Sequence, residues 1–446
     1  MPSASVTDKK CLSLLILIFS FLHLHLFAQE NSPWSRYGVG DPVPSTNILN
    51  RGMGYVAAAY NDQQTINFIN PASYSRLGLQ KAILDIGIDY HSRTMSSSGN
   101  ENATFSNIAI PYLAGAFQLK GEKQKRNWGV AFGLRPITKV NYNLQSESRI
   151  DSNQIIYNYK GTGGAYQAFA GTGIAIKNLS LGVNLGYRFG SKDYSTTVDL
   201  FNDTISGLFT SGQKEVRNNF GGFFTEWGVQ YEQRMNERSL LTFGAFGSIT
   251  NTLDVTSNET ISSVFQRSNG LDPIPVDSVS SKKDIKGTLL YPSYWGIGVV
   301  YDKARKSRLV AGADFTMQNW ASYRFLNQPD LLQNAWQIKA GVQWMPDAIG
   351  GSGKTTSRIL YRGGFMYGQE PFYAGSTSIN TYSITLGAGV PIKKYSYMEY
   401  NKNNVINIAF EWGQRGNGGQ ALSENFFRIA VSGSFSDIWF IKSKYD

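Results

Sequence analysis

The sequence has few residues able to carry out covalent or metal chemistry. Its only cysteine is Cys11, and its three histidines are His23, His25 and His91. A disulfide, a thiolate nucleophile or a zinc site needs several such side chains close together. No nucleophile motif of a hydrolase accompanies His91. We therefore expect no enzymatic activity, no bound metal and no cofactor.

A glycine-rich segment over residues 350–355 imitates a phosphate-binding loop. Such a loop needs a glycine five positions before Gly353, where this sequence has Ala348. It must also open a helix, whereas residues 358–367 alternate as a strand does. The segment is therefore predicted to be a loop or hairpin and not a nucleotide site.

In several stretches where apolar residues alternate with small or polar ones, some of the polar positions carry a charge, and these charged residues are the remaining candidates for a binding site. A carboxylate ligand in a poorly hydrated pocket would seek a guanidinium group, so Arg135, Arg188 and Arg362 are the candidate anion contacts. Acidic residues share the pattern, and ion pairs between neighbouring strands are therefore the favoured use of the whole set. Its members are Asp85, Asp89, Arg135, Arg188, Glu226, Asp314, Lys339, Arg362, Glu411 and Arg428.

The segments that carry these residues alternate apolar side chains with Gly, small or polar ones. The pattern is clear over residues 128–135, 179–189 and 336–344. A period of two predicts half-exposed β-strands, because a helix repeats every 3.6 residues. Successive side chains of a strand point to opposite faces, so the charged residues are expected to share the face opposite the apolar one.

Two architectures can use such strands. In a soluble sandwich the apolar face meets a core, whereas in an outer-membrane barrel it meets lipid and the polar face lines the lumen. The 9 Trp, 25 Tyr and 26 Phe include many at strand ends, where membrane-interface girdles require aromatics. Since a spanning strand needs about 10 residues, residues 82–436 hold about fourteen of them. We predict an all-β fold, a transmembrane antiparallel β-barrel of about 14 strands over residues 81–436.

Residues 1–28 have the layout of a secretory signal peptide. Lys9 and Lys10 precede a mostly apolar stretch over residues 12–27, and Ala28 precedes a polar sequence. The alternative, a single membrane anchor, would need about 20 apolar residues. A signal peptide directs the chain out of the cytoplasm, so we expect a location in the outer membrane of a Gram-negative bacterium, in contact with its lipid.

Residues 29–80 lack the alternation and are rich in Ser, Pro, Gly and Asn. A segment this short does not form a core alone, so we expect it to fold inside the barrel as a plug; the alternative is a disordered periplasmic tail. Asn70-Pro71-Ala72 is expected to form a tight turn, because a residue before proline avoids helical dihedral angles.

The remaining polar segments are interpreted as loops and a tail. Residues 437–446 form a charged C-terminal tail. Long polar loops are expected on the outer side of the membrane at residues 91–104, 145–160, 202–219, 252–286, 319–334 and 393–404. The formal net charge of +10 is scattered, so no nucleic-acid partner is expected, and the excess fits a surface that faces anionic lipid headgroups.

Arg51-Gly52-Met53-Gly54, residues 57–60 and Asn70-Pro71-Ala72 resemble the N-terminal hatch of the FadL/TodX outer-membrane transporters. The Asn-Pro-Ala triplet matches the hatch motif of this family and stands just before the first expected strand. Later parts of the same family are resembled more loosely by residues 161–164 followed by 179–187, by Asp314 with Trp320, and by residues 362–367 followed by 386–391. The resemblance implies a plugged barrel for passive uptake of hydrophobic compounds such as long-chain fatty acids, with a hydrophobic small molecule bound in the lumen.

Residues 32–41 and the chain end at 437–446 resemble, more narrowly, members of this superfamily from Bacteroidota. The enterobacterial transporters end on an aromatic residue of the last strand, whereas a charged decapeptide follows the last apolar strand here. Some relatives of this kind serve in protein secretion or barrel-assembly machinery. The alternative function is therefore a non-transporting barrel that is a subunit or scaffold of an outer-membrane protein complex.

Overall fold

The computed structural model describes residues 32–78, 81–97, 102–120, 126–151, 153–202, 210–265, 273–348, 355–374, 377–393, 403–416 and 422–438. These residues form a closed antiparallel β-barrel of 14 strands, which confirms the expected fold class. The expected signal peptide, nearly all of the segment 350–355 and residues 439–446 lie outside the described residues. Among the described residues, no helix is both long and apolar enough to cross a membrane.

The barrel strands follow the order of the chain, and three of them consist of two pieces each. The two-piece strands are β3 (Ala103–Ala109) with β4 (Leu113–Lys120), β9 (Ser239–Ser248) with β10 (Asn251–Phe265), and β11 (Ile274–Tyr291) with β12 (Tyr294–Ala304). The others are β2 (Lys81–Ser96), β5 (Arg126–Ile150), β6 (Asn153–Ile176), β7 (Leu179–Asn202), β8 (Ser211–Asn236), β13 (Arg308–Gln318), β16 (Ala335–Met345), β17 (Leu360–Ala374), β18 (Thr377–Lys393), β19 (Asn403–Arg415) and β20 (Ser423–Ile438). The barrel closes where β2 pairs with β20.

The two faces of the barrel wall differ in polarity. On the outer face Leu185 is 60% exposed and Ile88 is 58% exposed, whereas Arg188 on the inner face is 2% exposed. An apolar face exposed to this degree suits contact with lipid. All the charged residues that the alternation assigned to the inner face are buried or nearly so, so that prediction is confirmed.

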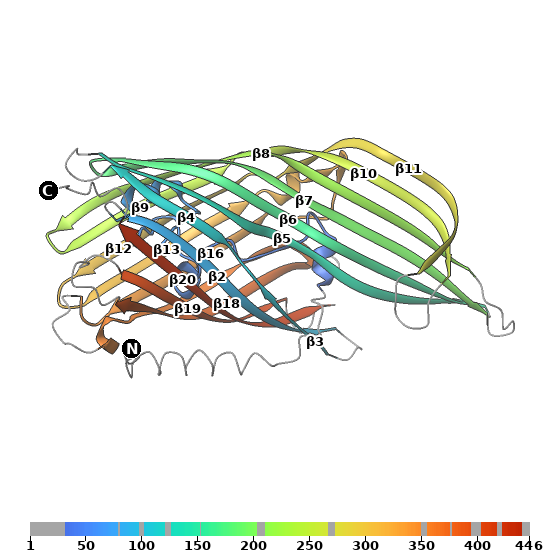
Figure 1. Cartoon of the computed structure of the whole chain (residues 1–446). Coiled ribbons are helices and arrows are strands. Elements are labelled where there is room, and N and C mark those ends of the chain that lie inside the picture. The colour runs from blue at the N-terminus through green and yellow to red at the C-terminus, as the bar shows by residue number, and fades with distance from the viewer. Residues whose placement is uncertain are drawn as a thin grey trace, which may run out of the picture.

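On one side of the barrel, the strands β5 to β8, β10 and β11 extend well beyond the other strands (Figure 1). The strands β5 to β8 contain 24 to 26 residues each, although about 10 residues suffice to span a bilayer. We call this projecting part of β5 to β8, β10 and β11 the outer extension. The loops expected at 145–160, 202–219 and 252–286 are therefore largely wrong, because most of those residues are paired strands.

The loop expected on the outer side at 393–404 is also wrong, because Lys393 of β18 pairs with Asn403 of β19 at the opposite end of the barrel. That end carries the short links between β6 and β7, β8 and β9, and β12 and β13. We call it the turn end. In outer-membrane barrels the short turns face the periplasm.

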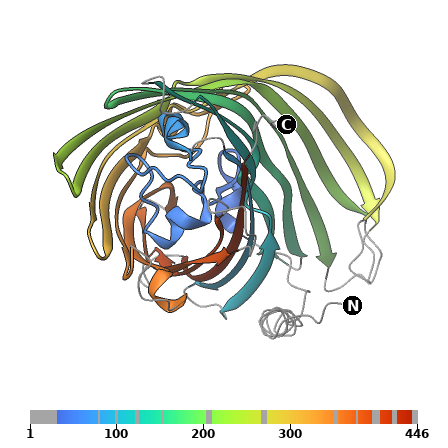
Figure 2. The same cartoon turned by 60° about the vertical axis from the view of Figure 1, so that its left-hand side comes forward.

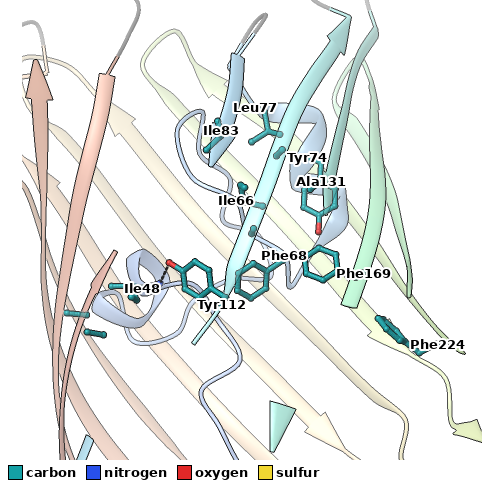
Figure 3. Packing of buried hydrophobic residues seen from close by; sticks show 14 residues of the cluster. Ile48, Ile66, Phe68, Tyr74, Leu77, Ile83, Tyr112, Ala131, Phe169 and Phe224 are labelled. Carbon is teal, nitrogen blue, oxygen red and sulfur yellow. Dashed lines mark hydrogen bonds between the residues drawn. The ribbon is translucent and has the colours of Figure 1, made fainter. Parts of the chain in front are cut away.

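Residues 32–78 lie inside the barrel as a plug (Figure 2). The buried plug side chains Ile66, Phe68 and Tyr74 pack with Ala131 and Phe169 of the wall (Figure 3). The regular elements of the plug are short, and packing against the wall therefore stabilises them. They are the 3-10 helix η1 (Pro33–Arg36), β1 (Asp41–Pro42), α2 (Ile48–Gly52) and the 3-10 helix η2 (Pro71–Arg76).

The barrel wall is interrupted between β3 and β5. The strand β4 pairs with β5 only as far as Leu113, opposite Leu134, and β3 pairs with β2 alone among the described strands. The edge of β5 beyond Leu134 therefore has no wall strand beside it in this part of the structure.

The first residues of the plug cover this free edge. The short β1 pairs with β5, with Pro42 opposite Thr138, and Ser32 N donates to Asn141 O at 2.8 Å. We call residues 32–43 the strap. Because the strap satisfies backbone groups of β5, the plug completes the wall as well as filling the lumen.

Candidate functional site

Glu226 on β8 is the centre of a buried polar cluster in the lumen. Its carboxylate accepts hydrogen bonds from Tyr294 Oη at 2.6 Å, Gln167 Nε2 at 2.9 Å and Asn184 Nδ2 at 3.0 Å. These donors come from β12, β6 and β7. Alternation places all four side chains on the inner face, and the register of neighbouring strands brings them together.

Two of the three candidate anion contacts lie beside this carboxylate. Arg188 Nη2 is 3.5 Å and Arg135 Nη2 is 3.6 Å from Glu226 Oε1. The guanidinium of Arg188 also lies over the rings of Phe224 and Tyr291, at 4.5 and 4.3 Å from their centroids. Glu226 already supplies an anion to both arginines, so a ligand carboxylate would have to compete with it.

Arg362, the third candidate, has different partners. It donates from Nε to Gln343 Oε1 at 2.7 Å and from Nη1 to Asn407 Oδ1 at 3.0 Å. Its Nη2 is buried and has no hydrogen-bond partner among the described residues. The three arginines are all in the lumen, but the contacts divide them into two places.

A second charge cluster fastens the strap. Asp41 accepts from Arg93 and Arg415, each at 3.0 Å, and from Ser32 Oγ at 3.0 Å. Glu424 lies 3.6 Å from Arg93 and 3.5 Å from Arg415. All these side chains are buried, and breaking such a network leaves a charge without compensation.

The centre of the plug is fixed by further polar contacts with the wall. Arg51 donates to Asp89 at 2.6 Å, and Tyr55 Oη donates to Glu411 at 2.6 Å. Asp314 Oδ2 accepts from the backbone N–H groups of Ala57 and Ala58, at 2.6 and 2.7 Å. Wall residues predicted as inner-face charges thus hold the plug in place.

The strap is also held where it approaches the outer extension. Gly38 N donates to Asp330 Oδ2 and Gly38 O accepts from Lys192 Nζ, both at 2.7 Å. Lys192 follows the exposed aromatic residues Tyr187 and Phe189 on β7 and lies where β7 enters the outer extension. Burial lowers the pKa of Lys192 to about 8, and the negative charge of Asp330 opposes this shift.

Asn70-Pro71-Ala72 lies at the start of η2, against the wall. Asn70 Oδ1 accepts from Ala72 N at 3.1 Å, which caps the helix. Its Nδ2 donates to the carbonyl oxygens of Ala58 at 2.6 Å, Val229 at 3.2 Å and Ala245 at 3.2 Å. One side chain therefore joins the plug to β8 and β9.

Replacing Asn70 by alanine is expected to lower the free energy of unfolding by about 2–3 kcal/mol, because several buried carbonyls and an N–H group lose their partner. Guanidinium titration of protein folded into lipid vesicles measures this change. Asn236→Ala is the matched control, because Asn236 lies in an exposed turn, and its effect should stay within about 0.5 kcal/mol. Equal effects of the two substitutions would contradict this role of Asn70.

A small cavity lies between the plug and the wall, and both charged and apolar side chains line it. This cavity of about 170 Å³ has Arg135, Arg188, Asp314, Lys339 and Arg415 among its lining residues. Small-molecule sites usually enclose about 300–1,000 Å³ and are predominantly apolar. In the described part of the chain, no group of three or more His, Cys, Asp or Glu side chains is arranged to hold a metal ion.

The sequence reasoning missed the network around Asp41. Arg93, Arg415 and Glu424 follow the alternation of residues already assigned to the inner face on the same strands, and Glu370 continues it from Arg362. They were missed because the expected strands ended too early. Asp41 itself lies outside any alternating segment, so its sequence context carries no such signal.

A protein-family model named BamG matches residues 9–446. No curated protein matches the sequence. Several solved structures are similar in fold. The Pseudomonas putida toluene transporter TodX has a TM-score of 0.56 and 14% identity, and the match covers 90% of this chain and 100% of that one.

A Pseudomonas aeruginosa FadL homologue has a TM-score of 0.54 and 15% identity, with 90% of this chain and 100% of that chain covered. The Ralstonia pickettii toluene transporter TbuX has a TM-score of 0.54 and 16% identity, with 87% and 97% covered. The predicted resemblance to the FadL/TodX barrels is thus confirmed for the fold. The predicted origin in Bacteroidota stays a prediction.

Proposed function

Because the chain belongs to the BamG family, we propose that it is a permanently plugged outer-membrane barrel that serves as a structural subunit of a protein secretion or barrel-assembly complex. The observation that carries this proposal is the fastening of the plug to the wall. Buried ion pairs hold the strap and the centre of the plug, and the strap completes the wall at β5. The family designation favours the same candidate.

Location in the outer membrane is part of the proposal. Its support is the exposed apolar outer face of a closed barrel, the face that outer-membrane barrels turn to lipid. Outer-membrane lipid and other proteins of the complex are then the partners.

Passive uptake of hydrophobic compounds is the second candidate. The FadL/TodX-like fold and the interruption between β3 and β5 favour it, because an interrupted wall offers a route between lumen and lipid once the strap leaves. In that case the plug has to move during each uptake event. Fatty-acid specificity would also require an apolar site larger than the cavity between plug and wall.

A disulfide between strap and wall separates the two candidates. Pro42→Cys with Thr138→Cys suits this purpose, because paired residues of antiparallel strands place their Cβ atoms about 4.5–5.5 Å apart, close to disulfide range. The only natural cysteine, Cys11, lies in the expected signal peptide. No natural thiol of residues 29–446 therefore competes with the introduced pair for disulfide formation. We expect the oxidised variant to support growth or secretion as the natural protein does.

The reduced form of the same variant is the matched control. Uptake of toluene and of oleate by cells that carry either form is measured in parallel. If oxidation lowers uptake about tenfold or more and reduction restores it, the plug moves in transport and the subunit proposal is wrong. Mild-detergent extraction followed by mass spectrometry adds a second readout, for which we expect a stoichiometric protein partner and no lumen ligand.

A further inference from the structure

Exposed positive charge gathers on two neighbouring links of the turn end. Arg234 and Arg238 lie in or near the link between β8 and β9, and Lys303, Arg305 and Lys306 lie in or near the link between β12 and β13; all five are exposed. The links are adjacent, because Ala304 N donates to the carbonyl of Arg238 at 2.9 Å. We call these five residues the turn-end basic patch.

The neighbouring acids are mostly engaged elsewhere. Asp302 pairs with Arg308 at 2.7 Å, and Glu232 pairs with Arg76 of the plug at 3.0 Å. Glu237 is the exposed acid within the same two links. None of the five residues of the patch forms a close ion pair with another residue in the described part of the chain. The charge of Arg234 acts on nearby Glu232, but the patch as a whole keeps a net positive charge.

The opposite end of the molecule is different. On the outer extension exposed charges of both signs pair with one another, as Arg217 does with Glu215 at 2.7 Å and Lys214 with Glu259 at 3.1 Å. A net positive surface attracts an anionic partner and speeds its encounter, whereas a mixed surface does so much less. The asymmetry therefore assigns the anionic partner to the turn end.

The height of the β8–β9 link favours a protein over a lipid as the partner of this part of the patch, whereas on the other link Lys303 lies opposite the exposed apolar residue Leu309. Tyr231 is an exposed aromatic residue near the turn-end edge of the apolar band, and β8 continues from there to Asn236. At about 3.3 Å per residue and a tilt of about 40°, the link rises about 13 Å beyond this ring. The polar layer of a bilayer is only about 5–8 Å thick on each side, so the tip of the link lies in water beyond the headgroups.

An apolar side chain accompanies the charges. Met235 is 61% exposed on the same link, and Met and Arg are enriched in protein–protein interfaces. The ion pair between Arg76 and Glu232 joins the plug to this part of β8. A partner on these links would therefore lie beside the point at which the plug reaches the turn end.

We propose that the turn-end basic patch docks an acidic segment of a water-soluble periplasmic protein. The proposal rests on the proposed function as a subunit and names the surface through which the subunit meets one partner. Lys and Arg side chains pair with the Asp and Glu side chains of that segment, and Met235 packs against an apolar side chain next to them.

Photo-crosslinking in living cells tests the proposal. A photoreactive phenylalanine analogue replaces Met235, and adducts are identified by mass spectrometry after irradiation. We expect a protein adduct whose crosslinked peptide is rich in Asp and Glu. In the variant Arg234→Gln, Arg238→Gln, Arg305→Gln and Lys306→Gln its yield should fall about tenfold or more, since each exposed pair contributes modestly and the four act together.

The matched control removes the same charge from the outer extension by Lys214→Gln, Arg217→Gln, Lys282→Gln and Lys283→Gln, and should change the yield less than about twofold. Heat-dependent gel mobility checks that both variants fold. The proposal is wrong if the adduct yield is unchanged in the turn-end variant. It is also wrong if no protein adduct forms and the turn-end variant instead loses anionic phospholipid that co-purifies with the natural protein. If the natural protein co-purifies with a partner but no adduct forms at Met235, only the proposed docking surface is wrong. If the natural protein is extracted in mild detergent without any protein partner, the proposed function is wrong as well.

Discussion

Replacing Glu226 by alanine is expected to lower the free energy of unfolding by about 3–5 kcal/mol, because it leaves Arg135 and Arg188 buried without their shared anion. The carboxylate also accepts hydrogen bonds from Tyr294, Gln167 and Asn184, and these donors would lose their acceptor. Cation–π contacts with Phe224 and Tyr291 hold the Arg188 guanidinium in place, so it does not escape to water by a simple rotation. The loss is therefore large for a single substitution.

Guanidinium titration of vesicle-embedded protein measures this loss. Glu226→Gln keeps an acceptor oxygen while removing the charge, and should fall between the natural protein and the alanine variant. Glu259→Ala is the control, because its partner Lys214 is half exposed and such pairs contribute little. A Glu226→Ala effect no larger than that of Glu259→Ala would show that water or another anion already compensates the arginines.

Alternation in the sequence predicted the barrel and the composition of its inner face. The physical reason is that each spanning strand must show apolar side chains to lipid and polar ones to the lumen. Asp85, Glu226 and Glu411 are examples of residues placed correctly on this basis. The pattern carries no information on which of these residues meet, because register and the position of the plug decide that.

The same reasoning failed where strands leave the membrane. In the outer extension, outward side chains no longer need to be apolar, as Asp193 and Ser195 of β7 illustrate. Their backbone pairing with β8 continues, and nothing in the hydropathy marks it. Predictions based on polarity therefore assigned loops to residues that form paired strands in the structure. The ion-pair network around Asp41 was missed for the same reason, since Arg93, Arg415 and Glu424 lie near strand ends.

The plug contacts connect the fold with the proposed function. A transporter plug must leave its place repeatedly, so its attachment has to be weak or locally adjustable. Here the plug contacts buried charged residues of β2 and β19 through Arg51, Tyr55 and Asp41. Asp314 of β13 and the contacts of Asn70 with β8 and β9 attach the plug at other places on the wall, and releasing the whole plug would disrupt all of them together. The arrangement suits a rigid subunit better than a gate.

Substituting Gly182 by leucine is expected to displace the plug and open the lumen to ions. Gly173, Gly182 and Gly228 lie opposite one another on β6, β7 and β8, and Asn70 and Pro71 pack directly on this row. A Cβ at Gly182 would overlap the carbonyl carbon of Pro71, and one at Gly228 would overlap Asn70 Oδ1. Both obstacles involve the Asn-Pro-Ala turn, which has no room to retreat without leaving the wall.

Conductance across a planar bilayer measures the result. We expect the natural protein to be nearly silent and Gly182→Leu to conduct about tenfold more, because an unplugged barrel of this strand number approaches the aqueous channel of porins. Gly212→Leu is the control, since nothing lies within 4 Å of a Cβ at that position. If the leucine variant does not fold, Gly182→Ala replaces it in the measurement, because its smaller side chain still places a Cβ against Pro71. A Gly182 variant that folds but does not conduct would contradict this prediction. It would mean that the barrel wall moves to accommodate the new side chain while the plug stays in place, so that the plug is more rigid than the wall around it.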